Sequence, residues 1–472
     1  MAEVLAQHRV QAWFQLLREG TVAAVKRRVS PGKAADTFCD SKDVFQPSLG
    51  LAEHLRAASF RVFTPCGPKC MLAHGLSRHR WRGCRFVFRI ASPLASEMKY
   101  QNVCVEGFGY TLAEEIVTSE EIECWLKPLY ERLRLSPGRL EMLTGIRQRR
   151  FWPRGELPSQ KSVESAARAM QAASVDPREI GCLIHASVCR DFLEPATACT
   201  VHHRLGLPHE CLIYDVSNAC LGILDGIVQV ANMIELGQIR AGLVVGTEGG
   251  RQLVETTIAR LNADTTVGRN ELKRAIASLT IGSGSAAVLL MHGDSSRTQN
   301  RLLAATARTD TRFHGLCHSG RDESVAGDMR PLMDTDSERL MLEGIRIGRD
   351  TFADFLQELN WSASDVDKTF CHQVGLTHRK LMFEALGLES SIDFPTVEML
   401  GNTGSVALPM AMALGIEQGH LAKDDHVAML GIGSGINSLM LAVDWQRACV
   451  PLAAASLPGA VENVRPAVFA AK

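Results

Sequence analysis

One stretch of the chain decides its fold: Ile213-Tyr214-Asp215-Val216-Ser217-Asn218-Ala219-Cys220-Leu221-Gly222-Ile223. It predicts a short apolar strand that turns sharply into a helix, with Cys220 at the turn. A thiol at the beginning of a helix meets unpaired backbone N–H groups and the positive end of the helix dipole, which favour the thiolate. Cys220 is therefore a candidate nucleophile, and the alternative is a buried structural cysteine.

The unit around Cys220 recurs later in the chain. A strand over 396–400, a tight turn at Asn402, a helix over 406–418 and a strand over 426–431 follow one another in the same order. We infer an internal duplication in which Cys220 and Asn402 occupy equivalent turns of two halves.

Strands alternate with helices through both halves, which predicts an α/β fold with mainly parallel sheets covered on both faces. Sites of such sheets lie at the strand ends, where the turns of two paired halves would meet. The strand over 366–373 ends in polar residues and supplies His372. We therefore expect Cys220 from one half to meet His372 and Asn402 from the other.

These three residue types together suit thioester chemistry. A cysteine takes an acyl group from a thioester at little energetic cost, because one sulfur replaces another. A second thioester that forms an enolate needs hydrogen-bond donors at its oxygen, and the N–H groups of His372 and Asn402 can supply them. Taken singly, each residue could instead be an ordinary turn or core residue.

The chain resembles the ketoacyl-ACP synthase III family of thiolase-fold condensing enzymes over residues 98–445. The resemblance is carried, in order, by Asp215–Gly222, Cys371-His372-Gln373, Gly401–Pro409 and Gly431-Ile432-Gly433-Ser434-Gly435. It implies a five-layered αβαβα thiolase-like fold of two duplicated halves, and a homodimer. It also implies an oxyanion hole made by the backbone N–H groups of Cys220 and Ser434.

The loop Ser187–Pro195 is similar to that of the OleA-type acyl-CoA condensing enzymes of olefin biosynthesis. This implies head-to-head, non-decarboxylative Claisen condensation of two fatty acyl-CoA molecules into a 2-alkyl-3-ketoacid. It also implies that Glu194 reaches the active site of the partner subunit as the base. A plain acyl-CoA must lose a proton from its α-carbon, so a carboxylate is useful there. Alternatively, Glu194 is an exposed acid or pairs with Arg190.

Two other functions stay open at this point. One is decarboxylative condensation of acyl-CoA with malonyl-ACP by a ketoacyl-ACP synthase III, and the other is a non-catalytic thiolase-fold partner subunit. The sequence His372-Gln373-Val374-Gly375 departs from the His-Gln-Ala-Asn that is common in that family. None of these reactions requires a metal, a flavin or a nicotinamide, and acyl-CoA enters as a substrate.

A basic segment, Thr144–Trp152, is predicted to be a loop. Its Arg147, together with Arg190, is a candidate for binding a phosphate-bearing substrate, either CoA or an acyl carrier protein. The alternative is a solvated turn.

The net charge of −1 gives no reason to expect a nucleic acid as partner. No apolar run is long enough for a membrane span. The 14 cysteines follow no disulfide framework, which favours a reducing, cytoplasmic setting.

Four segments are expected from the composition, the inferred duplication and the resemblance. Residues 1–97 hold 15 Lys and Arg against 7 Asp and Glu, lack a core-forming pattern, and are interpreted as a disordered or non-native extension. A transit segment, or a zinc site at Cys66, Cys70, His74 and His79, are the alternatives. Residues 98–295 form the half with the nucleophile, 296–446 the half with His and Asn, and 447–472 a flexible tail.

Overall fold

The computed structural model of the protein describes residues 98–320 and 332–448, which lie in one compact unit. The predicted extension over 1–97, with its candidate zinc ligands, and the tail from residue 449 onward lie outside the described residues. The unit is built on a ten-stranded sheet that has two parts of equal topology.

The first part of the sheet has the strand order β6-β5-β7-β8-β2. Its elements are β2 (Val103–Leu112), α5 (Pro158–Ala173), β5 (Ile180–Ala186), α6 (Thr197–Leu205), β6 (Leu212–Val216), α7 (Gly222–Glu235), β7 (Ala241–Glu248) and β8 (Gly284–His292). Strands β5, β6 and β7 are parallel, whereas β8 is antiparallel to both β7 and β2.

The second part has the order β12-β13-β14-β9. Its elements are β9 (Arg301–Thr309), to which β1 (Met98–Lys99) pairs, α11 (Ser337–Leu359), β12 (Lys368–Cys371), α12 (Leu376–Leu386), α14 (Ala407–Glu417), β13 (Asp425–Gly433) and β14 (Asn437–Trp445). Beside β12, a single parallel bridge joins Thr369 to Asp393. This bridge takes the position that β6 occupies beside β5 in the first part. This repeated path confirms the predicted duplication.

Two expectations about strands are wrong. The sheets are mixed rather than mainly parallel; β13 and β14, for example, are joined by a short turn that only antiparallel neighbours allow. The segment predicted as a strand over 396–400 contains the short helix α13 (Val397–Leu400), because its backbone turns back at once and Leu400 N–H pairs with Thr396 O.

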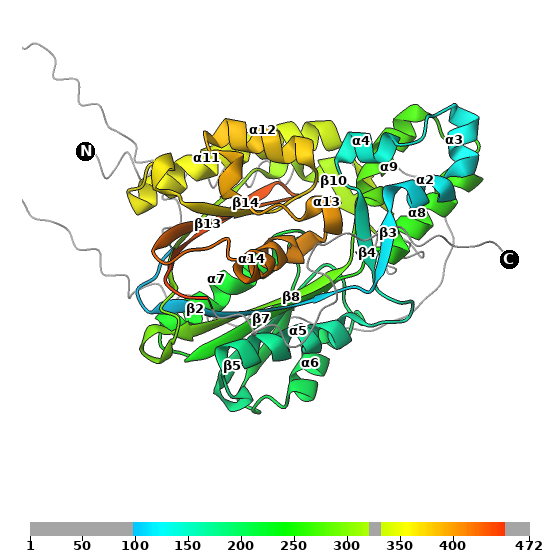
Figure 1. Ribbon diagram of the computed structural model, residues 1–472. Helices are drawn as coiled ribbons and strands as arrows, with labels where there is room; N and C mark the ends of the chain where they lie inside the picture. The colour runs from blue at the N-terminus through cyan, green and yellow to red at the C-terminus, as the bar shows by residue number, and fades with distance from the viewer. Residues whose placement is uncertain (1–97, 321–331, 449–472) are drawn as a thin grey trace, which may run out of the picture. The chain divides into compact units, whose positions relative to one another are not determined.

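The elements form five layers (Figure 1). Helices α11 and α12 cover one part of the sheet, α5 and α6 cover the other, and α7 and α14 lie between the two parts. The central core contains Ile227 of α7 and Met410 of α14, packed with buried strand residues from both parts such as Val244 and Met429. The predicted αβαβα fold is confirmed, and it places the beginnings of α7 and α14 in the same middle layer.

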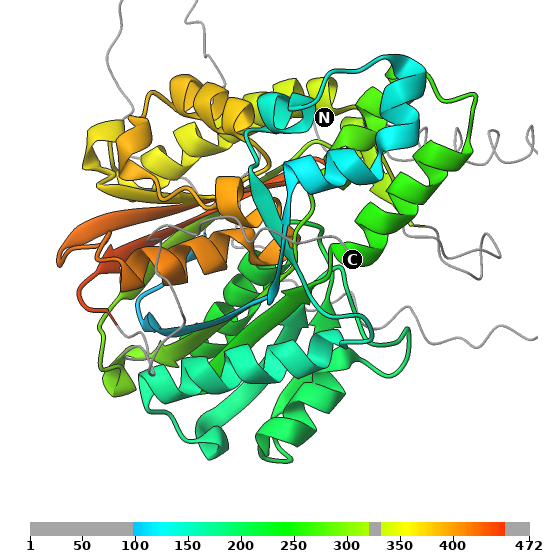
Figure 2. The same ribbon diagram turned by 45° about the vertical axis from the view of Figure 1, so that its right-hand side comes forward.

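A smaller group of elements lies at one end of the sheets, where Figure 2 brings it forward. It consists of β3 (Glu115–Thr118), α2 (Ser119–Trp125), α3 (Lys127–Leu133), α4 (Arg139–Thr144), β4 (Gln148–Phe151), α8 (Arg251–Ala263) and α9 (Arg269–Leu279), with a core of its own. A short hairpin of β10 (Cys317–Ser319) and β11 (Met333–Thr335) completes the fold. Among the described residues, no helix is long and apolar enough to cross a membrane.

Candidate active site

Cys220 lies in a tight turn between β6 and α7. The preceding residue, Ala219, has a left-handed φ of 45°, which a residue with a Cβ adopts only with some strain. Asn218 Nδ2 donates a hydrogen bond of 2.8 Å to Asp225 Oδ2 in the first turn of α7. The turn is thereby fixed to the helix, and the thiol is held at the beginning of a middle-layer helix.

The Cys220 thiol is not the thiolate expected from its place at a helix terminus. Burial, with contributions from the nearby Glu248 and Cys317, raises the pKa of Cys220 to about 12. Desolvation of the charged form therefore outweighs the helix dipole in the free enzyme. In the predicted role of nucleophile, Cys220 would lose its proton during attack rather than before it.

The glycine loop after β13 runs beside the cysteine turn. A Cβ at Gly433 would lie 3.6 Å from the backbone N of Cys220. Asn437 Nδ2 donates to Asn218 Oδ1 at 3.1 Å and to Ser434 O at 3.4 Å, so it ties the loop to the turn. Gly433, which directly precedes Ser434, thus lies beside the cysteine turn, and the backbone oxyanion hole of Cys220 and Ser434 stays a prediction.

His372 follows directly on β12 and is buried. Its backbone N–H pairs with Leu430 O, but neither ring nitrogen has a hydrogen-bond partner among the described residues. Burial, with a contribution from the neighbouring His378, lowers the pKa of His372 to about 3. The imidazole is therefore neutral near pH 7, with one nitrogen to donate a hydrogen bond and one to accept a proton.

Asn402 is held by its backbone in the turn before α14. Its N–H donates to Thr280 O and its carbonyl accepts from Gly282 N–H, both at 2.9 Å. Its Oδ1 accepts from Gly404 N–H at 3.0 Å. Because the side-chain oxygen is occupied in this way, the amide Nδ2 is left to donate to a ligand.

Glu194 lies in the exposed loop between β5 and α6. Among the described residues, no hydrogen bond or ion pair involves its carboxylate, and none joins it to Arg190. Its neighbours Phe192 and Leu193 are 57% and 54% exposed. The loop therefore presents an unpaired carboxylate beside two uncovered apolar side chains.

The predicted substrate-binding arginines are both exposed. Arg147 forms an ion pair with Glu398, and its backbone N–H donates to Glu398 O at 2.9 Å. Its charge is thus partly balanced within the chain. Substrate binding by Arg147 and Arg190 stays a prediction.

The expectation of a basic loop over 144–152 is wrong, because Gln148–Phe151 form β4. Arg149 in this strand is fully buried, with only its Nη1 paired, to Ser119 Oγ at 3.1 Å. Burial lowers its pKa to about 10. Arg149 therefore belongs to the interior, whereas Arg150 is half-buried and donates to Ala113 O at 2.9 Å.

Sequence reasoning missed Glu248, the last residue of β7. Its carboxylate is buried beside the site, and its charge contributes to the raised pKa of the Cys220 thiol. Its backbone carbonyl accepts a hydrogen bond of 2.9 Å from Trp152 Nε1. Glu248 could have been identified in the sequence from the polar pair Thr247-Glu248 at the end of an apolar strand.

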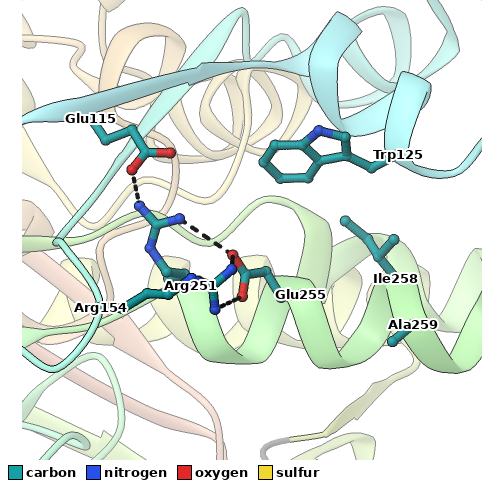
Figure 3. Close-up of a pocket in the computed structure, with 7 residues that line it drawn as sticks. All are labelled: Glu115, Trp125, Arg154, Arg251, Glu255, Ile258 and Ala259. Carbon is teal, nitrogen blue, oxygen red and sulfur yellow. Dashed lines mark hydrogen bonds and ion pairs between the residues drawn. The ribbon is translucent and has the colours of Figure 1, made fainter.

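A large open groove lies elsewhere, between β3 and α8 (Figure 3). It has a volume of about 630 Å³, and Trp125 faces Ile258 within it. Arg251 pairs with Glu115 and with Glu255, and Arg154 also pairs with Glu255. Its charges are balanced, and it contains none of the predicted catalytic residues.

The residues of the site can carry out acyl transfer. The Cys220 thiol lies at the beginning of a middle-layer helix, and a neutral imidazole and an amide lie at strand and helix ends of the other half. Such donors stabilise the negative charge that develops on a thioester oxygen. In the described part of the chain, no cluster of three His, Cys, Asp or Glu side chains could hold a metal ion.

Comparisons with known proteins agree with this geometry. Residues 159–278 match the thiolase N-terminal domain, and residues 356–445 match the C-terminal domain of 3-oxoacyl-[acyl-carrier-protein] synthase III. An acyl-CoA:acyl-CoA alkyltransferase from Shewanella oneidensis is 42% identical over 351 residues, which are 74% of this chain and 100% of that protein.

Two solved structures of the Xanthomonas campestris OleA are also similar, each at 32% identity over 100% of its own chain. A cysteine-to-serine variant with bound lauric acid and lauroyl-CoA covers 73% of this chain with a TM-score of 0.69. A glutamate-to-alanine variant covers 74% of this chain with a TM-score of 0.70. The chain therefore belongs to the acyl-CoA:acyl-CoA alkyltransferase family of thiolase-fold condensing enzymes.

Proposed function

We propose that the protein joins two fatty acyl-CoA molecules head to head by non-decarboxylative Claisen condensation. The observation that carries this proposal is the 42% identity to an acyl-CoA:acyl-CoA alkyltransferase whose whole length the chain covers. Binding of lauroyl-CoA by the Xanthomonas campestris OleA supports a long-chain acyl-CoA as substrate. The product is a 2-alkyl-3-ketoacid, once water has hydrolysed the remaining thioester.

In the first half reaction, Cys220 sulfur attacks the carbonyl carbon of one acyl-CoA. The thiol proton passes to a nitrogen of His372, the bond between the carbonyl carbon and the CoA sulfur breaks, and the proton then leaves with the CoA thiolate. The backbone N–H groups of Cys220 and Ser434 stabilise the oxyanion. His372 is unprotonated at neutral pH and so has a nitrogen free for the proton, although its pKa of about 3 makes it a weak base in the free protein.

In the second half reaction, the partner subunit's Glu194 removes a proton from the α-carbon of a second acyl-CoA. His372 and Asn402 donate hydrogen bonds to the enolate oxygen, and the carbanion attacks the acyl-cysteine and releases Cys220. The solved OleA variants support the role of Glu194: the substituted glutamate precedes the substituted cysteine by as many residues as Glu194 precedes Cys220.

A homodimer follows from this role, and one surface of the protein supports it. Strand β6 is the last strand of its part of the sheet, and Leu212 at its beginning is 51% exposed. The exposed Phe192 and Leu193 flank Glu194 in the neighbouring loop. A strand edge with uncovered apolar residues is suited to pair with a second copy.

The ketoacyl-ACP synthase III reaction is the second candidate, because residues 356–445 match the C-terminal domain of that enzyme. Its malonyl donor gains a carbanion by losing CO₂ and needs no base. The relatives named acyl-CoA:acyl-CoA alkyltransferase favour the condensation of two acyl-CoA molecules. They give no support to the alternative of a non-catalytic subunit. The described cysteines are all free, which fits a reducing, cytoplasmic setting.

Replacing the base separates the two reactions. Glu194→Ala is expected to abolish condensation of two acyl-CoA molecules while Cys220 still becomes acylated, since the first half reaction needs no carboxylate. Acylation is measured by mass spectrometry of the intact protein, and condensed product by gas chromatography. Glu389→Ala, an exposed acid on the α12 side, serves as control. Undiminished condensation by the Glu194→Ala variant would contradict the proposed role.

A further inference from the structure

A second carboxylate, Glu248, is buried beside Cys220 with no cation partner among the described residues. It is only 5% exposed. Its Oε1 accepts from Ser405 Oγ at 2.6 Å, from Ser405 N–H at 3.4 Å and from Val188 N–H at 3.1 Å. Its Oε2 accepts from Cys189 N–H at 3.3 Å. The charge is therefore balanced by hydrogen-bond donors alone.

These donors come from two segments that carry candidate catalytic groups. Val188 and Cys189 begin the loop that reaches Glu194, and Ser405 ends the turn that begins at Asn402. Ser405 Oγ also contacts Ala186 O at 3.2 Å, at the end of β5. Glu248 thus joins the nucleophile half of the fold to the half that carries Asn402.

The turn is shaped to accept a carboxylate at this point. Gly404 has a positive φ of 57°, and a Cβ on it would lie 3.2 Å from Glu248 Cδ. A carboxylate offers acceptors on both oxygens, whereas a glutamine amide would turn an NH₂ group toward one of the backbone N–H donors. These hydrogen bonds therefore require a carboxylate at this position, and an uncharged side chain of the same size would not replace it.

The hydrogen bonds also decide what Glu248 does. Four donors already occupy the two oxygens of this buried carboxylate, so neither oxygen is open to a substrate. Glu194, which has no such partner in the described structure, is the group left to remove a proton. Glu248 instead acts on the positions of other groups.

We propose that Glu248 is a positioning residue: it holds the Asn402 turn of its own active site together with the beginning of the loop that carries Glu194 to the active site of the partner subunit. This proposal rests on the proposed function, since it assigns Glu248 to the step that forms the carbon–carbon bond. That step needs both segments in place at once, whereas acyl transfer to Cys220 does not.

The test compares Glu248→Gln with Glu106→Gln. Glu106 is a matched control: it is equally buried and is bonded by Ser296, Arg297 and Thr298, away from the site. With myristoyl-CoA, we expect Glu248→Gln to acylate Cys220 at a rate near that of the wild type. It should form condensed product about 100-fold more slowly and release free fatty acid instead.

A second measurement does not depend on the condensation. Because the charge of Glu248 helps to raise the pKa of the Cys220 thiol, its removal should move the pH profile of Cys220 alkylation by iodoacetamide to lower pH. A purely structural role would leave this profile in place. If Glu248→Gln does not fold, Ser405→Ala removes the shortest hydrogen bond and keeps the charge, and should change the ratio of products alone.

The outcomes are distinguishable. An unchanged ratio of condensed product to fatty acid in Glu248→Gln, or the same change in Glu106→Gln, overturns the positioning role. An unmoved alkylation profile also overturns it. If the wild-type protein forms no condensed product from acyl-CoA, the proposed function fails, and the alkylation experiment still tests the placement of Glu248 beside the nucleophile.

Discussion

At Cys220 two physical effects act in opposite directions. The beginning of α7 favours a thiolate, but burial and the nearby Glu248 disfavour it, and they raise the pKa of the thiol to about 12. Cys220 of the free enzyme is therefore a thiol at neutral pH, and this state protects the residue from non-specific oxidation or alkylation.

Alkylation of Cys220 is expected to follow this balance. The rate with iodoacetamide should rise about tenfold per pH unit from pH 7 to pH 10 without levelling off, because the thiolate fraction keeps growing below the pKa. Peptide mass spectrometry of Cys220 at each pH gives the rate. An ordinary thiol levels off above about pH 9, and such a plateau would contradict the raised pKa.

Some residues of the site could be predicted from sequence, and others could not. Cys220, His372 and Asn402 follow strand or turn patterns that are local, so the sequence displays them. From the sequence, Arg149 was predicted to be a basic loop residue. Its burial depends on Gly282 and Gly401, which pack near its Cβ but lie far away in the sequence. Glu248 needs donors from two distant segments, and only the fold brings those together.

Among the elements, the start of a helix is marked locally, but its end is not. The capping box of Thr118 and Glu121 marks the beginning of α2 in the sequence, whereas the helix ends at Trp125 and α3 begins separately after Leu126. Strand partners are set by contacts far apart in the chain. This is why the antiparallel pairs and the short helix α13 could not be read from local pattern.

Helix α5 packs closely on β2 at Gly109. A Cβ at Gly109 would lie 2.0 Å from Ser165 O and 2.5 Å from Ala169 N, both in the backbone of α5. Gly109→Ala should therefore lower the free energy of unfolding by about 3 kcal/mol, because backbone must shift. Urea denaturation followed by circular dichroism measures it. Gly315→Ala, where a Cβ meets nothing within 4 Å, is the control and should change little.

At the scale of the whole molecule, the proposed dimer makes the active site a property of two chains. The edge of β6 and the apolar residues beside Glu194 are the surface on which this depends. A monomer would still contain Cys220, His372 and Asn402, but it would lack the partner subunit's Glu194.

Leu212→Lys should therefore separate the subunits, since it places two charges at the strand edge. We expect a monomer by light scattering after gel filtration, with Cys220 still acylated and condensation lost. Leu236→Lys, at a 73% exposed position after α7, is the control and should leave both the dimer and the activity intact. A Leu212→Lys monomer that still condenses acyl-CoA would show that the base does not come from a partner.

The central claim is that two acyl-CoA molecules are sufficient for the reaction. Incubation of the wild-type protein with myristoyl-CoA as the only acyl donor tests it most directly, with Cys220→Ala as the control and mass spectrometry of the extracted products. The expected product contains two myristoyl chains joined by a carbon–carbon bond, as the 2-alkyl-3-ketoacid or the ketone formed by its loss of CO₂. Free fatty acid alone, or condensed product only when malonyl-ACP is added, would contradict the claim.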